Sequence, residues 1–202
     1  MHQKIKSSLG LLITAFLFSG LLQANTLQAD APAKQPSKLA ARQQQLSVAL
    51  EGAEKASWIA EGNGAHILYV FFDPNCPYCH KLYERLRSRV GQNELQVRWI
   101  PVGILFTTSL GKAAALLEAQ DPLLAFRQNE EKFTHTEHGA VSETFASAAT
   151  EKKLKQNSQL LQQIGGQSVP TILYREASGL IKVRQGAPSQ KKLDAFLAQV
   201  AS

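Results

Sequence analysis

The pattern of apolar and polar positions predicts a strand, a helix and a second strand between residues 67 and 100. Residues 67–72 (ILYVFF) are a continuous apolar run, which is typical of a strand covered on both faces. The polar turn 73–75 (DPN) ends this run, and apolar residues then recur at spacings of three and four until Gly91, which predicts a helix. Residues 95–100 alternate between apolar and polar, as expected for a strand with one buried face. These elements form a βαβ unit, for which we expect a right-handed crossover.

The pattern turns helical from about residue 109 to 165 and then returns to strands. Three helices are predicted in this insertion, around Leu116, around Phe126 and around Leu160, whereas the polar stretch 134–147 is a loop or a weak helix. A hairpin of 171–174 and 180–183 follows, and a last helix opens near Pro188. The predicted fold is therefore α/β, in the order βαβ, helical insertion, ββα.

The N-terminal region has the pattern of a targeting segment followed by a linker. Lys4 and Lys6 precede an apolar stretch over 9–22, which is shorter than the ~20 residues that a bilayer span needs. We therefore interpret residues 1–24 as a cleaved signal peptide, with an uncleaved membrane anchor as the alternative. Export to the bacterial periplasm follows from this reading. Residues 25–37 contain two prolines and read as a linker.

Residues 38–55 form a predicted helix with a narrow apolar stripe. The stripe consists of Leu39, Leu46, Leu50 and Ala53, at near-heptad spacing. A helix of this length is marginal alone, and the stripe has no obvious place on the α/β domain. We therefore predict that it holds a homodimer together. The alternative is that the helix packs against its own domain, which is predicted to start at residue 57.

Composition narrows the function only slightly. Hydrophobic residues make up 44 % and charged residues 19 % of the 202 positions, as in an ordinary globular protein. The net charge of +6 is partly due to the signal segment and is spread thinly over the remainder, which argues against nucleic-acid binding.

The candidate chemistry lies in Cys76 and Cys79, the only cysteines of the chain. They stand at the junction of the buried strand and the helix, where unpaired N–H groups and the helix dipole stabilise a thiolate. An ordinary cysteine is only about 3 % thiolate at pH 7, whereas motifs of this kind shift the pKa to roughly 3.5–7.5. We expect Cys76 to be exposed and nucleophilic. Cys79, one turn further on, should be buried with a raised pKa and should resolve mixed disulfides.

Other roles for the two cysteines fit less well. As a structural disulfide, a four-residue ring constrains the unfolded chain by only about 2 kcal/mol. A zinc site would need two further ligands, and the pair His135 and His138 lies 55 residues beyond Cys79 in a polar stretch, so no metal site is expected. His80 is either a solvated helix residue or a titrating group that tunes Cys76.

The segment from Phe71 to Leu82 (FFDPNCPYCHKL) resembles the active-site segment of the DsbC/DsbG family of periplasmic thiol:disulfide interchange proteins. The resemblance runs from about residue 57 to the C-terminus and implies a thioredoxin-like fold. It also implies a cis peptide bond before Pro170, next to Cys76. Substrate binding and tuning of the site would then involve Pro77, Tyr78, His80, Val169 and Pro170. Clients would be exported proteins with disulfides or thiols, a membrane reductase of the DsbD type would recharge the site, and no cofactor is required.

The sequence departs from this family in three respects. The family members have a separate N-terminal dimerisation domain, for which residues 25–56 are too short. They have threonine before the cis-proline, where this chain has Val169, as in DsbA-type oxidases. The strand 67–72 lacks the buried acid of thioredoxin, which leaves the proton acceptor of Cys79 open. The leading hypothesis is an isomerase or reductase; a DsbA-like oxidase is the alternative, although Tyr78 stands where such oxidases often have histidine. A non-enzymatic chaperone or assembly protein is the weaker alternative.

Overall fold

The computed structural model describes residues 37–92, 94–136 and 138–201. The predicted signal peptide and most of the predicted linker lie outside these residues. Eleven elements are present in the described part, in the order α1 (Lys38–Glu54), β1 (Ile59–Glu61), β2 (His66–Phe72), α2 (Pro77–Leu86), β3 (Leu95–Pro101), α3 (Ser109–Glu118), α4 (Pro122–Glu131), α5 (Ala148–Gln163), β4 (Thr171–Arg175), β5 (Ile181–Gln185) and α6 (Gln190–Leu197). Within the described ranges, no helix is both long and apolar enough to cross a bilayer.

The five strands form one mixed sheet in the order β1-β3-β2-β4-β5. β2 and β3 are parallel, as the predicted βαβ unit requires, and Val70 pairs with Trp99. β4 is antiparallel to β2, and β5 is antiparallel to β4, which is the predicted hairpin. The central strand β2 has neighbours on both sides, and its last five residues are buried, in agreement with its continuous apolar run.

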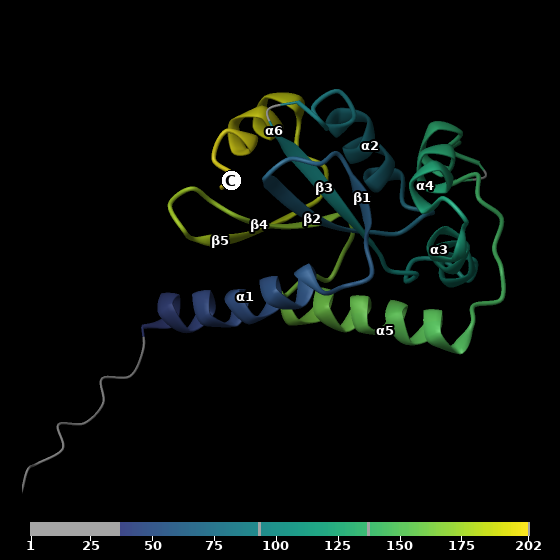
Figure 1. The fold of residues 1–202 in the computed structure, drawn as a ribbon, viewed down its shortest axis with the longest axis horizontal. Helices are drawn as coiled ribbons and strands as arrows, with labels where there is room; N and C mark the ends of the chain where they lie inside the picture. The colour runs from purple at the N-terminus through teal and green to yellow at the C-terminus, as the bar shows by residue number, and fades with distance from the viewer. Residues whose placement is uncertain (1–36, 93, 137, 202) are drawn as a thin grey trace, which may run out of the picture. The chain divides into compact units, whose positions relative to one another are not determined.

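Helices cover both faces of the sheet (Figure 1). α2 and α6 lie on one face, and α1 and α5 lie on the other, roughly in line, with α1 in contact with the end of α5. An aromatic cluster joins α4 to the sheet and to α2, because the ring of Phe126 contacts the rings of Phe72, Tyr83 and Trp99 at centroid distances of 5.1, 5.5 and 4.8 Å. This cluster fixes the helical insertion beside the C-terminal end of β2, where the CXXC segment begins.

The prediction for the stripe of α1 is wrong in one respect, because most of that stripe has a place on its own domain. Leu46, Leu50 and Ala53 are buried in the core. The side chain of Gln43 also binds the edge strand β5, donating to the Ile181 carbonyl over 3.1 Å and accepting from the Ile181 amide over 2.9 Å. Only Leu39 of the stripe is exposed. The apolar side chains that suggested a dimer interface therefore stabilise the monomer fold.

Candidate active site

The site begins where the apolar strand β2 ends and α2 starts. Asp73 follows β2 and is completely buried, yet its carboxylate is fully hydrogen-bonded. Its two oxygens accept from the Asn75 amide (2.9 Å), the Ser109 hydroxyl (2.8 Å), the Ile104 amide (2.7 Å) and the Leu105 amide (3.0 Å). The Asp73 carbonyl also accepts from the amide of Cys76 over 3.0 Å. This one side chain therefore ties the turn before the cysteines to the loop after β3.

Cys76 is the N-cap of α2, with Pro77 in the first turn, where a missing N–H costs nothing. Its Sγ accepts a hydrogen bond from the Cys79 amide over 3.3 Å. The neighbouring Cys79 thiol, and then the amides of Cys79 and Tyr78, lower the pKa of Cys76 against an opposing effect of burial. The direction agrees with the expectation for a thiol at a helix N-terminus.

Cys79 lies one turn into the helix and is buried, and both cysteines are free thiols. Burial, followed by the adjacent Cys76, raises the pKa of Cys79 well above that of an ordinary cysteine. The two thiols thus differ in the direction predicted from the sequence. The expected difference in exposure is wrong, however, since only 3 % of Cys76 and 1 % of Cys79 is accessible.

The segment before β4 contributes to the burial of Cys76. The Val169–Pro170 peptide bond is cis, as the resemblance implied. The carbonyl oxygen of Val169 lies 3.5 Å from Sγ of Cys76, so residues 93 positions apart meet at the sulfur. No local sequence pattern predicted this contact, and only the family resemblance implied it.

Tyr78 and His80 point to different surroundings. Tyr78 is 60 % exposed, and the ammonium group of Lys81 lies 5.2 Å from its ring centre. His80 instead stacks on Phe133 at 4.7 Å and lies between two carboxylates. Its Nε2 is 3.7 Å from Glu84, and its Nδ1 is 3.6 Å from Glu130. The Glu130 carboxylate is the main reason why the pKa of His80 is raised.

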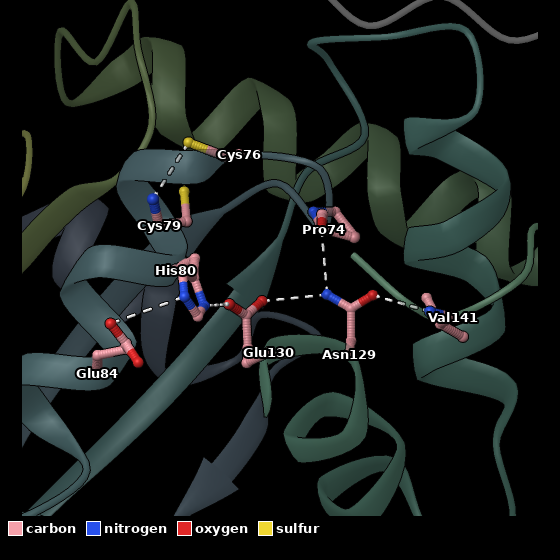
Figure 2. A network of polar contacts seen from close by, with 8 residues as sticks. All are labelled: Pro74, Cys76, Cys79, His80, Glu84, Asn129, Glu130 and Val141. Carbon is pink, nitrogen blue, oxygen red and sulfur yellow. Dashed lines mark hydrogen bonds and ion pairs between the residues drawn. The ribbon is translucent and has the colours of Figure 1, made fainter. Parts of the chain in front are cut away.

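Sequence reasoning missed Asn129 and Glu130, two buried polar residues near the end of α4 (Figure 2). The Asn129 amide donates to the Pro74 carbonyl and to Glu130, both over 3.1 Å, and accepts from the Val141 amide. A signal was present, because these residues follow the core residue Phe126 by three and four positions and therefore share its face. The helical insertion thus reaches the cysteine turn through buried polar groups.

The exposed surface beside the site is apolar. The loop after β3 carries Ile104, Leu105 and Phe106, whose side chains are 46, 44 and 48 % exposed. Asp73 holds this loop through two amides, which places it next to the turn that leads to Cys76. In the described part of the chain, no group of three or more histidine, cysteine, aspartate or glutamate side chains gathers as a metal-ligand set.

The fold and the paired thiols define a thioredoxin-like protein, and comparison with known proteins agrees. Residues 53–201 match the model of the thioredoxin-like domain family, and the chain belongs to that family. The catalytic domain of ScsC from Proteus mirabilis has the same fold, with a TM-score of 0.64 at 21 % identity over 77 % of this chain and 96 % of that domain.

Within this family, the chain is a DsbC/DsbG-like protein, which confirms the resemblance. It is 35 % identical to the thiol:disulfide interchange protein DsbG of Pseudomonas aeruginosa and 30 % identical to that of Escherichia coli, each over 71 % of this chain. The matched region spans 56 % and 58 % of those relatives, so the chain corresponds to little more than half of their length.

Proposed function

We propose that this chain is a periplasmic thiol–disulfide oxidoreductase that isomerises or reduces disulfides in exported proteins through Cys76 and Cys79. The observation that carries the proposal is the position of Cys76 at the N-cap of α2, where its Sγ accepts from the Cys79 amide, with the buried Cys79 thiol one helical turn further on. The pKa values of the two thiols shift in opposite directions, as this arrangement requires. A lowered pKa makes Cys76 the attacking thiolate, and a raised pKa keeps Cys79 protonated until it is needed.

The reaction starts when the Cys76 thiolate attacks a client disulfide and releases one client sulfur as a thiolate. The resulting mixed disulfide has two fates. If a second client thiol attacks it, the client leaves with a rearranged disulfide and Cys76 returns as a thiolate. If Cys79 attacks it, the client leaves reduced and Cys76 and Cys79 form a disulfide. No cofactor enters either route, because the sulfur atoms carry the electrons.

Polypeptides with exposed apolar segments are the clients that the surface favours. Tyr78 of the motif is exposed, and so are Ile104, Leu105 and Phe106 in the loop that Asp73 holds next to the cysteine turn. Apolar side chains are therefore exposed where a client disulfide must approach. Misfolded exported proteins expose such segments together with wrongly paired cysteines. The Val169 carbonyl lies 3.5 Å from the sulfur, and Val169 and Pro170 complete the proposed client contact.

The proposed compartment rests on the sequence and its relatives, and the proposed redox partner rests on the family resemblance. The predicted signal peptide and the DsbG relatives support a periplasmic location, and a membrane reductase of the DsbD type would return Cys76 and Cys79 to the thiol state. A homodimer through residues 38–55 is not part of this proposal. The large apolar residues of α1 that are left exposed, Leu39 and Val48, are nine positions apart and so lie about 180° from each other around the helix.

An oxidase of the DsbA type is the second candidate, and the specific observation in its favour is Val169 before the cis-proline. Turnover of two substrates separates the candidates. An isomerase or reductase, supplied in reduced form, restores activity to a substrate protein with scrambled disulfides. An oxidase, supplied in oxidised form, instead acts on the fully reduced substrate. Rescue that survives in Cys76→Ser would indicate a non-enzymatic chaperone and would contradict the proposal.

The variant Cys79→Ser distinguishes an isomerase from a reductase within the first candidate function. Isomerisation by the client's own thiols needs only Cys76, so this variant keeps a part of the activity on scrambled substrate if the protein is an isomerase. Net reduction of a client needs both cysteines, so a reductase loses all turnover. Failure of the wild-type protein on both substrates would contradict the proposed function as a whole.

A further inference from the structure

We propose that His80 and the buried Glu130 together form the proton acceptor that Cys79 needs when it resolves a mixed disulfide. The inference rests on the proposed function and names the residues that complete its second step. The two side chains are called the His80–Glu130 pair below. α2 provides the imidazole directly after Cys79, and the helical insertion provides the carboxylate from α4.

Glu130 is a buried carboxylate with unused hydrogen-bonding capacity. Its side chain is 2 % exposed, and Oε1 accepts only from Asn129. Among the described residues, Oε2 of Glu130 and Nδ1 of His80 have no hydrogen-bond partner, and they face each other at 3.6 Å. Buried polar atoms in this condition are uncommon and call for an explanation. A proton shared between the two atoms, taken up and released during the reaction, is that explanation.

One member of the pair, His80, is next to Cys79 in the chain, and the other, Glu130, acts on Cys79 electrostatically. Figure 2 shows His80 following Cys79 on the first turn of α2, with the Glu130 carboxylate 3.6 Å from Nδ1 of its ring. The negative charge of Glu130 contributes to the raised pKa of Cys79, after burial and the neighbouring Cys76. The amide of His80 also donates to the Cys76 carbonyl over 3.1 Å, which holds the backbone of His80 in the first turn of α2.

The other carboxylates near the site are less suited to accept this proton. Asp73 already accepts four hydrogen bonds, so protonating it would break one of them. Glu61 is held by the Trp99 indole over 3.0 Å and by the Arg127 guanidinium over 2.9 Å. Cys76 itself cannot accept the proton, because its sulfur is bonded to the client at that moment. The His80–Glu130 pair is the remaining buried base in the described part of the site.

The resolving step then balances as follows. The Sγ–H group of Cys79 gives its proton to the His80–Glu130 pair. The thiolate of Cys79 forms a bond to Sγ of Cys76, and the bond from Cys76 to the client sulfur breaks. The client sulfur leaves with the electron pair as a thiolate and afterwards takes up a proton, so the two cysteines are oxidised by two electrons and the client disulfide is reduced by two.

The pair accepts a proton only in its deprotonated state, which makes the step pH-dependent. Glu130 raises the pKa of His80, and burial raises the pKa of Glu130, so the pair keeps one proton to a higher pH than isolated histidine would. The resolving rate should therefore increase as the pH rises through a value above the ordinary histidine pKa of about 6.5. The charged and titratable groups that face the pair are Glu84 of α2, Glu61 of β1 with its partner Arg127, Cys79, and His138, whose ring lies 6.0 Å from that of Phe133.

Single-turnover kinetics with the small aromatic disulfide dithiobis(nitrobenzoate) tests the proposal. Reduced protein releases one coloured thiolate when Cys76 attacks the reagent and a second when Cys79 resolves the adduct, so stopped-flow absorbance separates the two steps. In Glu130→Gln, which keeps the shape of the side chain, we expect an unchanged first phase. The second phase should slow about 10-fold or more and lose its inflection with pH, as for removal of a positioned base.

The control is Glu131→Gln, the same substitution at the adjacent, exposed position, for which both phases should match the wild type. His80→Gln removes the other member of the pair and should also slow the second phase, which keeps the proposal testable if Glu130→Gln does not fold. An unchanged or faster second phase in Glu130→Gln would overturn the proposal, since removing the negative charge alone lowers the pKa of Cys79. Equal slowing of both phases would overturn it too. A wild-type protein without the first phase would contradict the proposed function instead.

Discussion

The carbonyl oxygen of Val169 lies 3.5 Å from Sγ of Cys76, on a sulfur that also accepts from the Cys79 amide over 3.3 Å. The two contacts favour different protonation states. The amide stabilises a thiolate, whereas the carbonyl accepts from a thiol and faces a thiolate with its negative end. The backbone of residue 169 therefore lies at the sulfur, and we expect a polar side chain at this position to alter the balance between the two states.

Val169→Thr should lower the pKa of Cys76. Threonine is nearly the same size as valine and adds one hydroxyl, which can donate to the thiolate. A hydrogen bond to a charged group contributes about 1.5–3 kcal/mol when buried, and we expect a smaller effect here, about half to one pKa unit, because the hydroxyl also competes for backbone carbonyls. Thiolate absorbance against pH measures the shift in both proteins. A change below about 0.2 units, or an upward one, would contradict tuning by residue 169.

Alkylation of the wild-type protein should depend on pH as the opposite shifts of the two thiols require. The thiolate is the reactive form, so a lowered pKa means that the Cys76 rate reaches half its plateau below the ordinary value of about 8.5. Cys79 should stay unmodified at neutral pH, since its pKa is raised. Mass spectrometry after iodoacetamide treatment identifies the modified cysteine.

A matched variant checks the cause of this shift. The Cys79 thiol is the largest influence that lowers the pKa of Cys76, so Cys79→Ala should move the midpoint of Cys76 alkylation upward. A midpoint that stays in place would show that the helix N-terminus alone sets the pKa of Cys76, and a wild-type midpoint at or above about 8.5 would refute the lowered pKa itself.

Substitutions in α1 should separate its buried residues from its exposed ones. Leu50→Ala removes a side chain that is 4 % exposed in the core, and we expect a loss of about 2–5 kcal/mol in the free energy of unfolding. Leu39→Ala, at a 65 % exposed position of the same helix, should change it by less than about 0.5 kcal/mol. Urea denaturation measures both. A small loss for Leu50→Ala would show that α1 does not belong to the domain core.

Light scattering of the wild type and of Leu39→Ala bears on the predicted homodimer. If residues 38–55 formed a dimer interface through exposed leucine, Leu39→Ala would weaken association without affecting the fold. An oligomeric state that is identical in the wild type and in this variant would leave α1 as a helix of the monomer.

Much of the fold could be predicted because its elements carry local signals. The run 67–72 and the alternation in 95–100 predicted β2 and β3, and the turn 178–179 predicted the hairpin of β4 and β5. The strand β1 (Ile59–Glu61) was missed, since three residues are too few to show a period. It exists because Ile59 pairs with Trp99 at the edge of β3, a contact that depends on the folded sheet.

The reactive cysteines of the candidate site could be predicted from the sequence, whereas most of the residues that surround them could not. Cys76 and Cys79 were found from their spacing at a strand–helix junction, and the directions of their pKa shifts followed from position in the helix. The burial of Cys76 and the approach of Glu130 depend on segments far away in the sequence. Glu130 lies within a polar run (RQNEE) that resembles a solvated helix end, and only its spacing from Phe126 indicates that it faces inward.

Trapping of mixed disulfides tests the assignment of Cys76 and Cys79 most directly. Because both thiols are buried, their roles rest on the N-cap position and the opposite pKa shifts rather than on a difference in exposure. Each single variant, Cys76→Ser and Cys79→Ser, is mixed with a disulfide-containing substrate protein and analysed by non-reducing electrophoresis and mass spectrometry. The account predicts a stable adduct through Cys76 in Cys79→Ser and none in Cys76→Ser. Equal adducts from the two variants, or an adduct through Cys79 alone, would contradict it.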